Sequence, residues 1–124
     1  SLNMETYDEW KGTTLVRDLI FMLNNVLTGF IENAPDAISK ARYSAMRERA
    51  VGLGMMGFHS YLQQKGIPSE SERAREINKE VFKYVHEESV KATKELGLLY
   101  GECPDFQTDL TFIFEDGSNL SLNS

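Results

Sequence analysis

The sequence predicts a mainly α-helical fold, a bundle of about four helices with one long helix near 69–97 and a β-hairpin at the C-terminal end. Three observations indicate this class. Apolar residues recur every three or four positions over most of the first hundred residues, which is the helical period. The longest uninterrupted pattern of this kind runs from Ser69 to Gly97. After Gly101 the apolar residues alternate with polar ones, as in strands.

The first predicted helix begins at Thr13 or Thr14, either of which can cap it, and ends near Asn33, just before Pro35. Its apolar positions are spaced by three and four, which places them on one stripe: Leu15, Leu19, Met22, Leu23, Val26, Leu27 and Phe30. Further apolar residues widen this stripe: Val16, Ile20 and Ile31. The extra width predicts that the helix is buried on more than one side.

Three further helices complete the predicted bundle. Shorter ones are expected over 36–43, after Pro35, and over roughly 50–65, before the Gly66-Ile67-Pro68 terminator. The long helix has Ser69 as its cap and Glu72 three positions later, which is a capping-box pattern. Opposite charges lie four residues apart on its polar face, and this predicts a solvated surface.

The last segment predicts two strands. Leu110 and Phe112 alternate with polar residues before the Asp116-Gly117 turn, and Leu120 and Leu122 do so after it. Because an isolated two-stranded hairpin is marginally stable in water, we expect it to dock on the helices or on a partner.

Charge and composition exclude several functional classes. The 124 residues include 13 Lys+Arg and 19 Asp+Glu, a net charge of −6, which argues against nucleic-acid binding. Cys103 is the single cysteine, so an intramolecular disulfide and a multi-cysteine zinc site are both excluded, and a cytoplasmic location is expected. The longest apolar run is interrupted by Arg17, Asp18, Asn24 and Asn25, which argues against a membrane helix. No signal-peptide pattern is present at the start.

The sequence offers no complete catalytic or metal-binding pattern. A di-iron helical bundle needs Glu-x-x-His pairs, but Met56 and Lys83 stand three positions before His59 and His86. Cys103 has no adjacent basic residue to lower the pKa of its thiol. We therefore predict no catalytic, cofactor-binding or metal-binding residue in this chain.

Residues 52–57 match the G-x-G-x-x-G fingerprint of dinucleotide sites. That site requires a buried strand before the glycines, whereas Arg47-Glu48-Arg49 precedes them here. The favoured interpretation is structural: Gly52, Gly54 and Gly57, together with Tyr61, belong to a helix start and allow another backbone to approach closely. Nucleotide binding is retained as a third alternative.

A longer stretch around these glycines resembles a known family. Residues 47–67 read RERAVGLGMMGFHSYLQQKGI, which is similar to the R-x-x-G-[LI]-G-x-x-G-[FL] block of the large (alpha) subunit of ribonucleotide reductase. Residues 1–10 resemble the segment after that family's second redox-active cysteine. Residues 97–105, ending Gly-Glu-Cys-Pro-Asp, resemble the close of its long helix. The resemblance covers 1–105, a helical part of the barrel domain, and leaves 106–124 as a divergent tail.

This resemblance implies a radical enzyme that reduces ribonucleotides, with an α/β barrel, a cysteine that forms a thiyl radical and a reducing cysteine pair. None of these cysteines matches Cys103, so no catalytic residue is carried over. The main hypothesis is a fragment or split piece of the large subunit, inactive alone, whose partners are the remaining reductase segments. The alternative is a stand-alone helical module without catalysis that self-associates through apolar helix faces.

Overall fold

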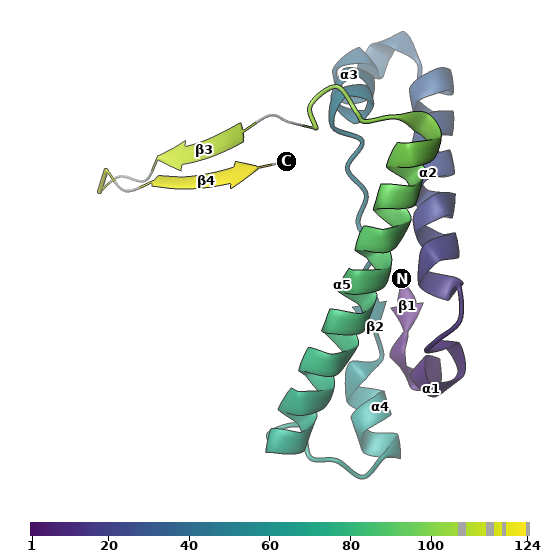
Figure 1. Ribbon diagram of the computed structural model, residues 1–124, viewed down its shortest axis with the longest axis vertical. Helices are drawn as coiled ribbons and strands as arrows, with labels where there is room; N and C mark the ends of the chain where they lie inside the picture. The colour runs from purple at the N-terminus through teal and green to yellow at the C-terminus, as the bar shows by residue number, and fades with distance from the viewer. Residues whose placement is uncertain (107–108, 114–115, 118, 124) are drawn as a thin grey trace.

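The computed structural model describes residues 1–106, 109–113, 116–117 and 119–123. Two long helices, α2 (Leu15–Asn33) and α5 (Glu72–Tyr100), pack against each other and form most of the molecule (Figure 1). Shorter elements lie at the two ends of this pair. The predicted mainly helical class is confirmed, while the number and bounds of the helices differ from the prediction.

Helix α2 has the predicted position, but its buried face is narrower than its apolar stripe. Val16 and Ile20 are the buried residues of this helix. Met22 and Val26, from the predicted stripe, are 51% and 62% exposed. The stripe therefore contains more apolar surface than α5 covers, and the prediction of burial on several sides is not met within the described residues.

Helix α5 begins later and ends later than predicted. Ser71, not Ser69, is the N-cap, and its Oγ accepts a hydrogen bond from the amide of Ala74 at 3.2 Å. The helix continues past Gly97 to Tyr100, and Gly101 ends it with a φ of 81°. A glycine inside a helix lowers its stability without breaking it, so packing along the helix outweighs the local preference.

The middle of the chain differs most from the prediction. A 3-10 turn over Asp36–Ile38 leads into α3 (Ser39–Glu48), which is longer than the predicted helix over 36–43. The predicted helix over 50–65 is wrong in its first half. Residues 50–54 form neither helix nor strand, Met55–Met56 form strand β2, and only Phe58–Gln64 form a helix, α4.

Two left-handed residues explain this change. Arg49 has a φ of 47° and ends α3, and Gly57 has a φ of 78° and precedes α4. A single helix over 50–65 cannot run through Gly57, and α3 cannot run on past Arg49, because a right-handed helix needs negative φ at every residue. Pairing with the N-terminus then selects the extended conformation.

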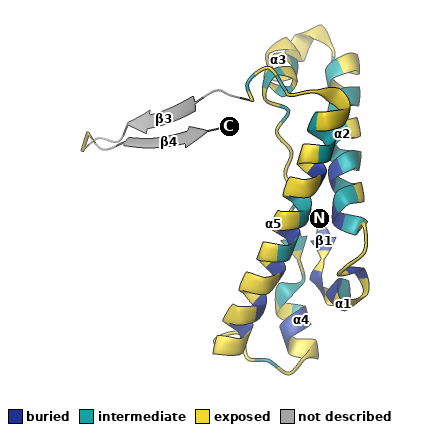
Figure 2. Cartoon of the chain, in the orientation of Figure 1, coloured by how far each residue is buried: buried dark blue, intermediate teal, exposed yellow. Residues whose placement is uncertain are grey.

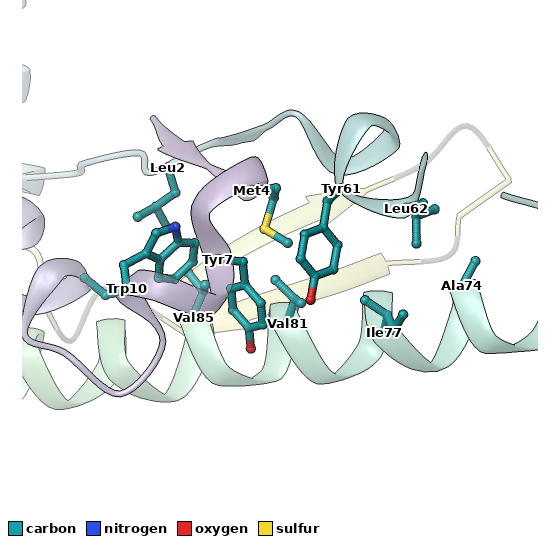
Figure 3. Packing of buried hydrophobic residues seen from close by; sticks show 11 residues of the cluster. Leu2, Met4, Tyr7, Trp10, Tyr61, Leu62, Ala74, Ile77, Val81 and Val85 are labelled. Atoms are coloured by element: carbon teal, nitrogen blue, oxygen red, sulfur yellow. The ribbon is translucent and has the colours of Figure 1, made fainter. Parts of the chain in front are cut away.

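The N-terminal ten residues supply much of the core. Strand β1 (Leu2–Asn3) pairs in parallel with β2, and it leads through a 3-10 turn (Met4–Thr6) into α1 (Tyr7–Trp10). Figure 3 shows Met4 and Tyr7 of this segment beside Tyr61 of α4 and Val81 of α5, with Trp10 on the other side of Tyr7. The buried cluster is continuous across these elements: Leu2, Met4, Tyr7, Trp10, Val16, Tyr61, Leu62, Ala74, Ile77, Val81 and Val85. Figure 2 shows that burial falls off toward the other end of the α2–α5 pair.

At the C-terminal end, β3 (Asp109–Ile113) and β4 (Asn119–Asn123) pair antiparallel, with Leu110 opposite Leu122. These paired strands lie on either side of Asp116-Gly117, where the sequence predicted a turn. The sequence also predicted that this strand pair docks on the helices. The side chains that would make such contacts lie outside the described residues.

No single helix among the described residues is long and apolar enough to cross a membrane. The segments Met4–Trp10 and Leu15–Asn33 reach that length and composition only together, across a bend of 113°.

Candidate functional site

The predicted glycine site lies where the N-terminal strand meets the segment before α4. The amide of Leu2 donates to the carbonyl of Gly54 at 2.8 Å, and Leu2 and Asn3 pair with Met55 and Met56. Asn3 is held in turn, because its carbonyl accepts a hydrogen bond from the Trp10 indole at 2.8 Å. The N-terminal strand therefore pairs with the segment that contains the three glycines, residues 52–57, which we call the glycine block.

The three glycines have different surroundings, and they do not lie in a helix start as predicted, because α4 begins only at Phe58. A Cβ on Gly57 would lie 3.1 Å from Oδ1 of Asn3 and 3.7 Å from the amide nitrogen of Glu5. A Cβ on Gly54 would lie 3.7 Å from Oγ of Ser1, which is ordinary contact. Around Gly52 nothing lies within 4 Å. Position 57 therefore requires a glycine, because its φ is positive and the N-terminal segment lies close to it. Position 52 has no such requirement.

Tyr61 belongs to α4 and connects the glycine segment to the N-terminal helix. Its ring is buried and meets the ring of Tyr7 edge to face at 5.8 Å. Its hydroxyl donates to Oδ1 of Asp8 at 3.1 Å, and Lys65 forms an ion pair with the other oxygen of the same carboxylate. Burial, and then the bond to Asp8, raise the pKa of Tyr61. The bond from Lys65 lowers the pKa of Asp8.

This arrangement differs from a dinucleotide site. In that fingerprint the strand precedes the glycines, whereas β2 lies between the second and third glycine here. The space in front of Gly57, where a phosphate would approach, is occupied by Asn3 and Glu5. The glycine pattern therefore serves contact between two segments of the polypeptide in this fold.

Two arginines link separate segments at the end of the molecule opposite the N-terminal core. The sequence alone did not indicate a role for them. The Arg47 guanidinium holds Asp105, and the amide of Asp105 donates to the Arg47 carbonyl at 3.1 Å. The Arg49 guanidinium donates to Oδ1 of Asn24 at 2.8 Å and to Oγ1 of Thr28 at 2.7 Å. Together they tie α2, α3 and the chain after α5. Such pairs lie 21 to 58 positions apart, and no local spacing predicts them.

A groove of about 1150 Å³ lies beside this junction, between α2, the end of α5 and the segment after α3. Its walls include a set of apolar side chains: Ile20, Val51, Leu96, Leu98, Tyr100 and Phe106. Leu98 is 90% exposed, and Leu99 and Tyr100 beside it are also exposed. A helix end that is apolar on all sides is typical of a buried position, so this end of α5 has the composition of an interface.

The remaining candidate groups do not assemble into a centre. His59 and His86 are exposed, and the Cys103 thiol donates to the carbonyl of Glu48 at 3.5 Å. Among the residues that the structure describes, no three His, Cys, Asp or Glu side chains gather in a way that could hold a metal ion.

Comparison with known proteins places this geometry in a family. The family model "Ribonucleotide reductase, barrel domain" matches residues 2–113. The ribonucleoside-diphosphate reductase large subunit of Invertebrate iridescent virus 6 is 46% identical over 106 residues, which is 85% of this chain and 11% of that protein. The putative large subunit of Frog virus 3 is 42% identical over 108 residues, which is 85% of this chain and 19% of that protein.

A solved structure agrees with these relatives. The alpha subunit of the class Id ribonucleotide reductase of Actinobacillus ureae superposes with a TM-score of 0.79 at 38% identity, covering 82% of this chain and 20% of that one. The chain thus spans between about a tenth and a fifth of the length of these proteins. The resemblance drawn from the glycine block is confirmed, and the chain belongs to the ribonucleotide reductase large-subunit family, with residues 2–113 in its barrel domain.

Proposed function

We propose that this chain supplies a helical part of a ribonucleotide reductase barrel, and that it serves the reduction of ribonucleoside diphosphates only together with the remaining segments of a large subunit. By itself it is non-catalytic and holds no cofactor. We place it in the cytoplasm, and we keep the division into a reductase-like part, 1–105, and a tail, 106–124, as a prediction.

One observation carries this proposal: the parallel pair β1–β2, two residues in each strand, carries the family's glycine block. Parallel strands occur almost only in larger sheets that are covered on both faces. A pair this short therefore has the form of a piece of a sheet that other strands extend.

The single cysteine supports the same conclusion from chemistry. The activity implied by the resemblance needs a radical-forming cysteine and a separate reducing pair, hence three thiols, and this chain has Cys103 alone. Because Cys103 matches none of the three, all of these thiols must come from other polypeptide.

A graft tests this proposal. The segment of the Actinobacillus ureae alpha subunit that aligns with this chain is replaced by the corresponding residues of this chain. Reduction of a ribonucleoside diphosphate is then measured with the other components that the parent enzyme requires. We expect the graft to keep measurable turnover and the isolated 124-residue chain to have none. Turnover by the isolated chain, or a folded but inactive graft, would contradict the proposal.

A second candidate function is a self-associating module without catalysis. The exposed apolar residues of α2 and of the end of α5 favour it, because a monomer leaves them in water. Size-exclusion chromatography with light scattering separates the two. A discrete dimer or tetramer of the isolated chain supports the module, whereas a monomer that requires the grafted context for activity supports the reductase piece.

A further inference from the structure

The segment between α3 and β2, residues 50–53, has an open backbone. No hydrogen bond joins its amide or carbonyl groups to any other group that the structure describes. On either side the backbone is engaged: the amide of Arg49 donates to the carbonyl of Ala45 at 3.0 Å, and the carbonyl of Gly54 accepts from Leu2. Four consecutive residues next to a paired strand therefore keep their donors and acceptors free.

The side chains along this segment alternate as in a strand. Leu53 and Met55 are half-buried against the core, while Gly52 and Gly54, which precede each of them in the sequence, are exposed. Val51 continues the side of Leu53 and Met55 by the two-residue period, and it is 41% exposed in the wall of the large groove. If β2 were extended back through residues 50–53, the side of the strand that carries Val51 would thus face the apolar groove, which this chain leaves open.

The charges of the groove do not select a charged ligand. Arg49 and Lys94 in its walls are offset by Glu48 and Glu102, and Asp105, also in the wall, is paired with Arg47. Backbone hydrogen bonds and apolar contact are the interactions that this surface offers, and strand addition uses both.

We propose that residues 50–53 are a docking edge, on which an extended segment of the remaining reductase polypeptide pairs as a β-strand and places an apolar side chain in the groove beside Val51. This inference rests on the proposed function. The occupant follows from the family match, because a closed barrel leaves no strand edge unpaired and the related large subunits are at least about five times longer than this chain.

The experiment uses the graft and the full 124-residue chain. Hydrogen exchange is measured for the amides of residues 50–53 in both. We expect fast exchange at all of these amides in the isolated chain. In the graft, exchange should be slowed by about tenfold or more at the alternate amides that face the added strand, since pairing protects amides. Equal exchange rates in the two proteins would overturn the docking edge.

Proline substitutions test the same edge by activity. Successive amides of a strand point to opposite edges, so Val51→Pro and Gly52→Pro each remove a donor from a different edge. We expect at least one of them to lower turnover of the graft by about tenfold or more, because proline removes a ladder hydrogen bond. Gly52→Ala separates loss of the donor from change of the side chain. It keeps the amide, so we expect it to lower turnover less than Gly52→Pro does.

The outcomes separate this inference from the function on which it rests. An unmodified graft that is inactive, yet protects these amides, would refute the proposed function and leave the docking edge standing. An active graft with unprotected amides, or with both proline variants fully active, would refute the docking edge alone. The proline variants should not lower the melting temperature of the isolated chain, and a marked drop there would mean that the amides have partners within this chain.

Discussion

Replacing Gly57 with alanine should destabilise the isolated chain much more than the same change at Gly52. At Gly57 the backbone has a φ of 78°, a left-handed conformation that costs a residue with a Cβ about 1–2 kcal/mol. The new Cβ would also lie 3.1 Å from Oδ1 of Asn3, the atom that accepts the amide of Glu5 at 3.0 Å. Displacing that bond costs about 1 kcal/mol more.

The two costs together give a loss of about 2–3 kcal/mol in the free energy of unfolding. For a domain of this size, a loss of this magnitude lowers the melting temperature by roughly 10 °C. Gly52→Ala adds a methyl group in open space and should change stability by at most about 0.5 kcal/mol. Gly57→Asn should fall between the two, since asparagine tolerates the left-handed region better than alanine.

Urea denaturation followed by circular dichroism, with thermal melts in parallel, gives these differences. The reasoning fails if Gly57→Ala loses less than about 0.5 kcal/mol, or if Gly52→Ala loses as much as Gly57→Ala. A continuous helix through residues 52–57 would instead make both alanine substitutions stabilising, by up to about 1 kcal/mol each, because alanine favours the helix more than glycine does.

Three further perturbations check the core, the N-terminal ion pair and the contact between the long helices. Met4→Ala should lower the free energy of unfolding by about 2–5 kcal/mol because Met4 is fully buried, whereas Met56→Ala, at a residue 59% exposed, should lower it by less than about 0.5 kcal/mol. Similar losses for the two variants in urea denaturation would contradict the assigned core. The pKa of Asp8 lies below its ordinary 3.8, so its contribution to stability is present above that pH and is lost as the pH falls through the lower value of the folded state. Asp8→Asn should therefore flatten the acid side of a stability–pH curve, and an unchanged curve would refute this. Arg17 and Glu95 pair at 2.6 Å with side chains 40% and 43% exposed, so a double-mutant cycle should give a small favourable coupling that falls with added NaCl. A coupling that salt does not change would argue against a solvated pair.

Periodicity predicted the long helices well because their stabilising contacts follow their own repeat. The buried residues of α5, such as Ala74, Ile77 and Val81, recur at spacings of three and four, so the pattern that predicts the helix also predicts its buried face. Helix α2 shows the limit of this argument. Its apolar stripe is wider than one partner helix can cover, and the sequence alone does not say which part of the stripe that partner takes.

The glycine block shows why the candidate site was only partly predictable. Its residues identified the family correctly, yet their conformation was predicted wrongly, because a strand two residues long and more than fifty positions away decides it. The two arginines at the other end were missed for the same reason. Arg47 meets Asp105 only after α5 has returned the chain to the end of α3.

The sequence by itself determined the helical class, the family and the presence of a single cysteine. These depend on composition, on local periodicity and on a contiguous motif. Tertiary structure alone decided that the glycines accept a strand, that Val16 and Ile20 form the buried face of α2, and that residues 50–53 keep an open backbone beside an apolar groove. These features depend on contacts between distant segments, whose free energies outweigh the modest local preferences that a sequence pattern records.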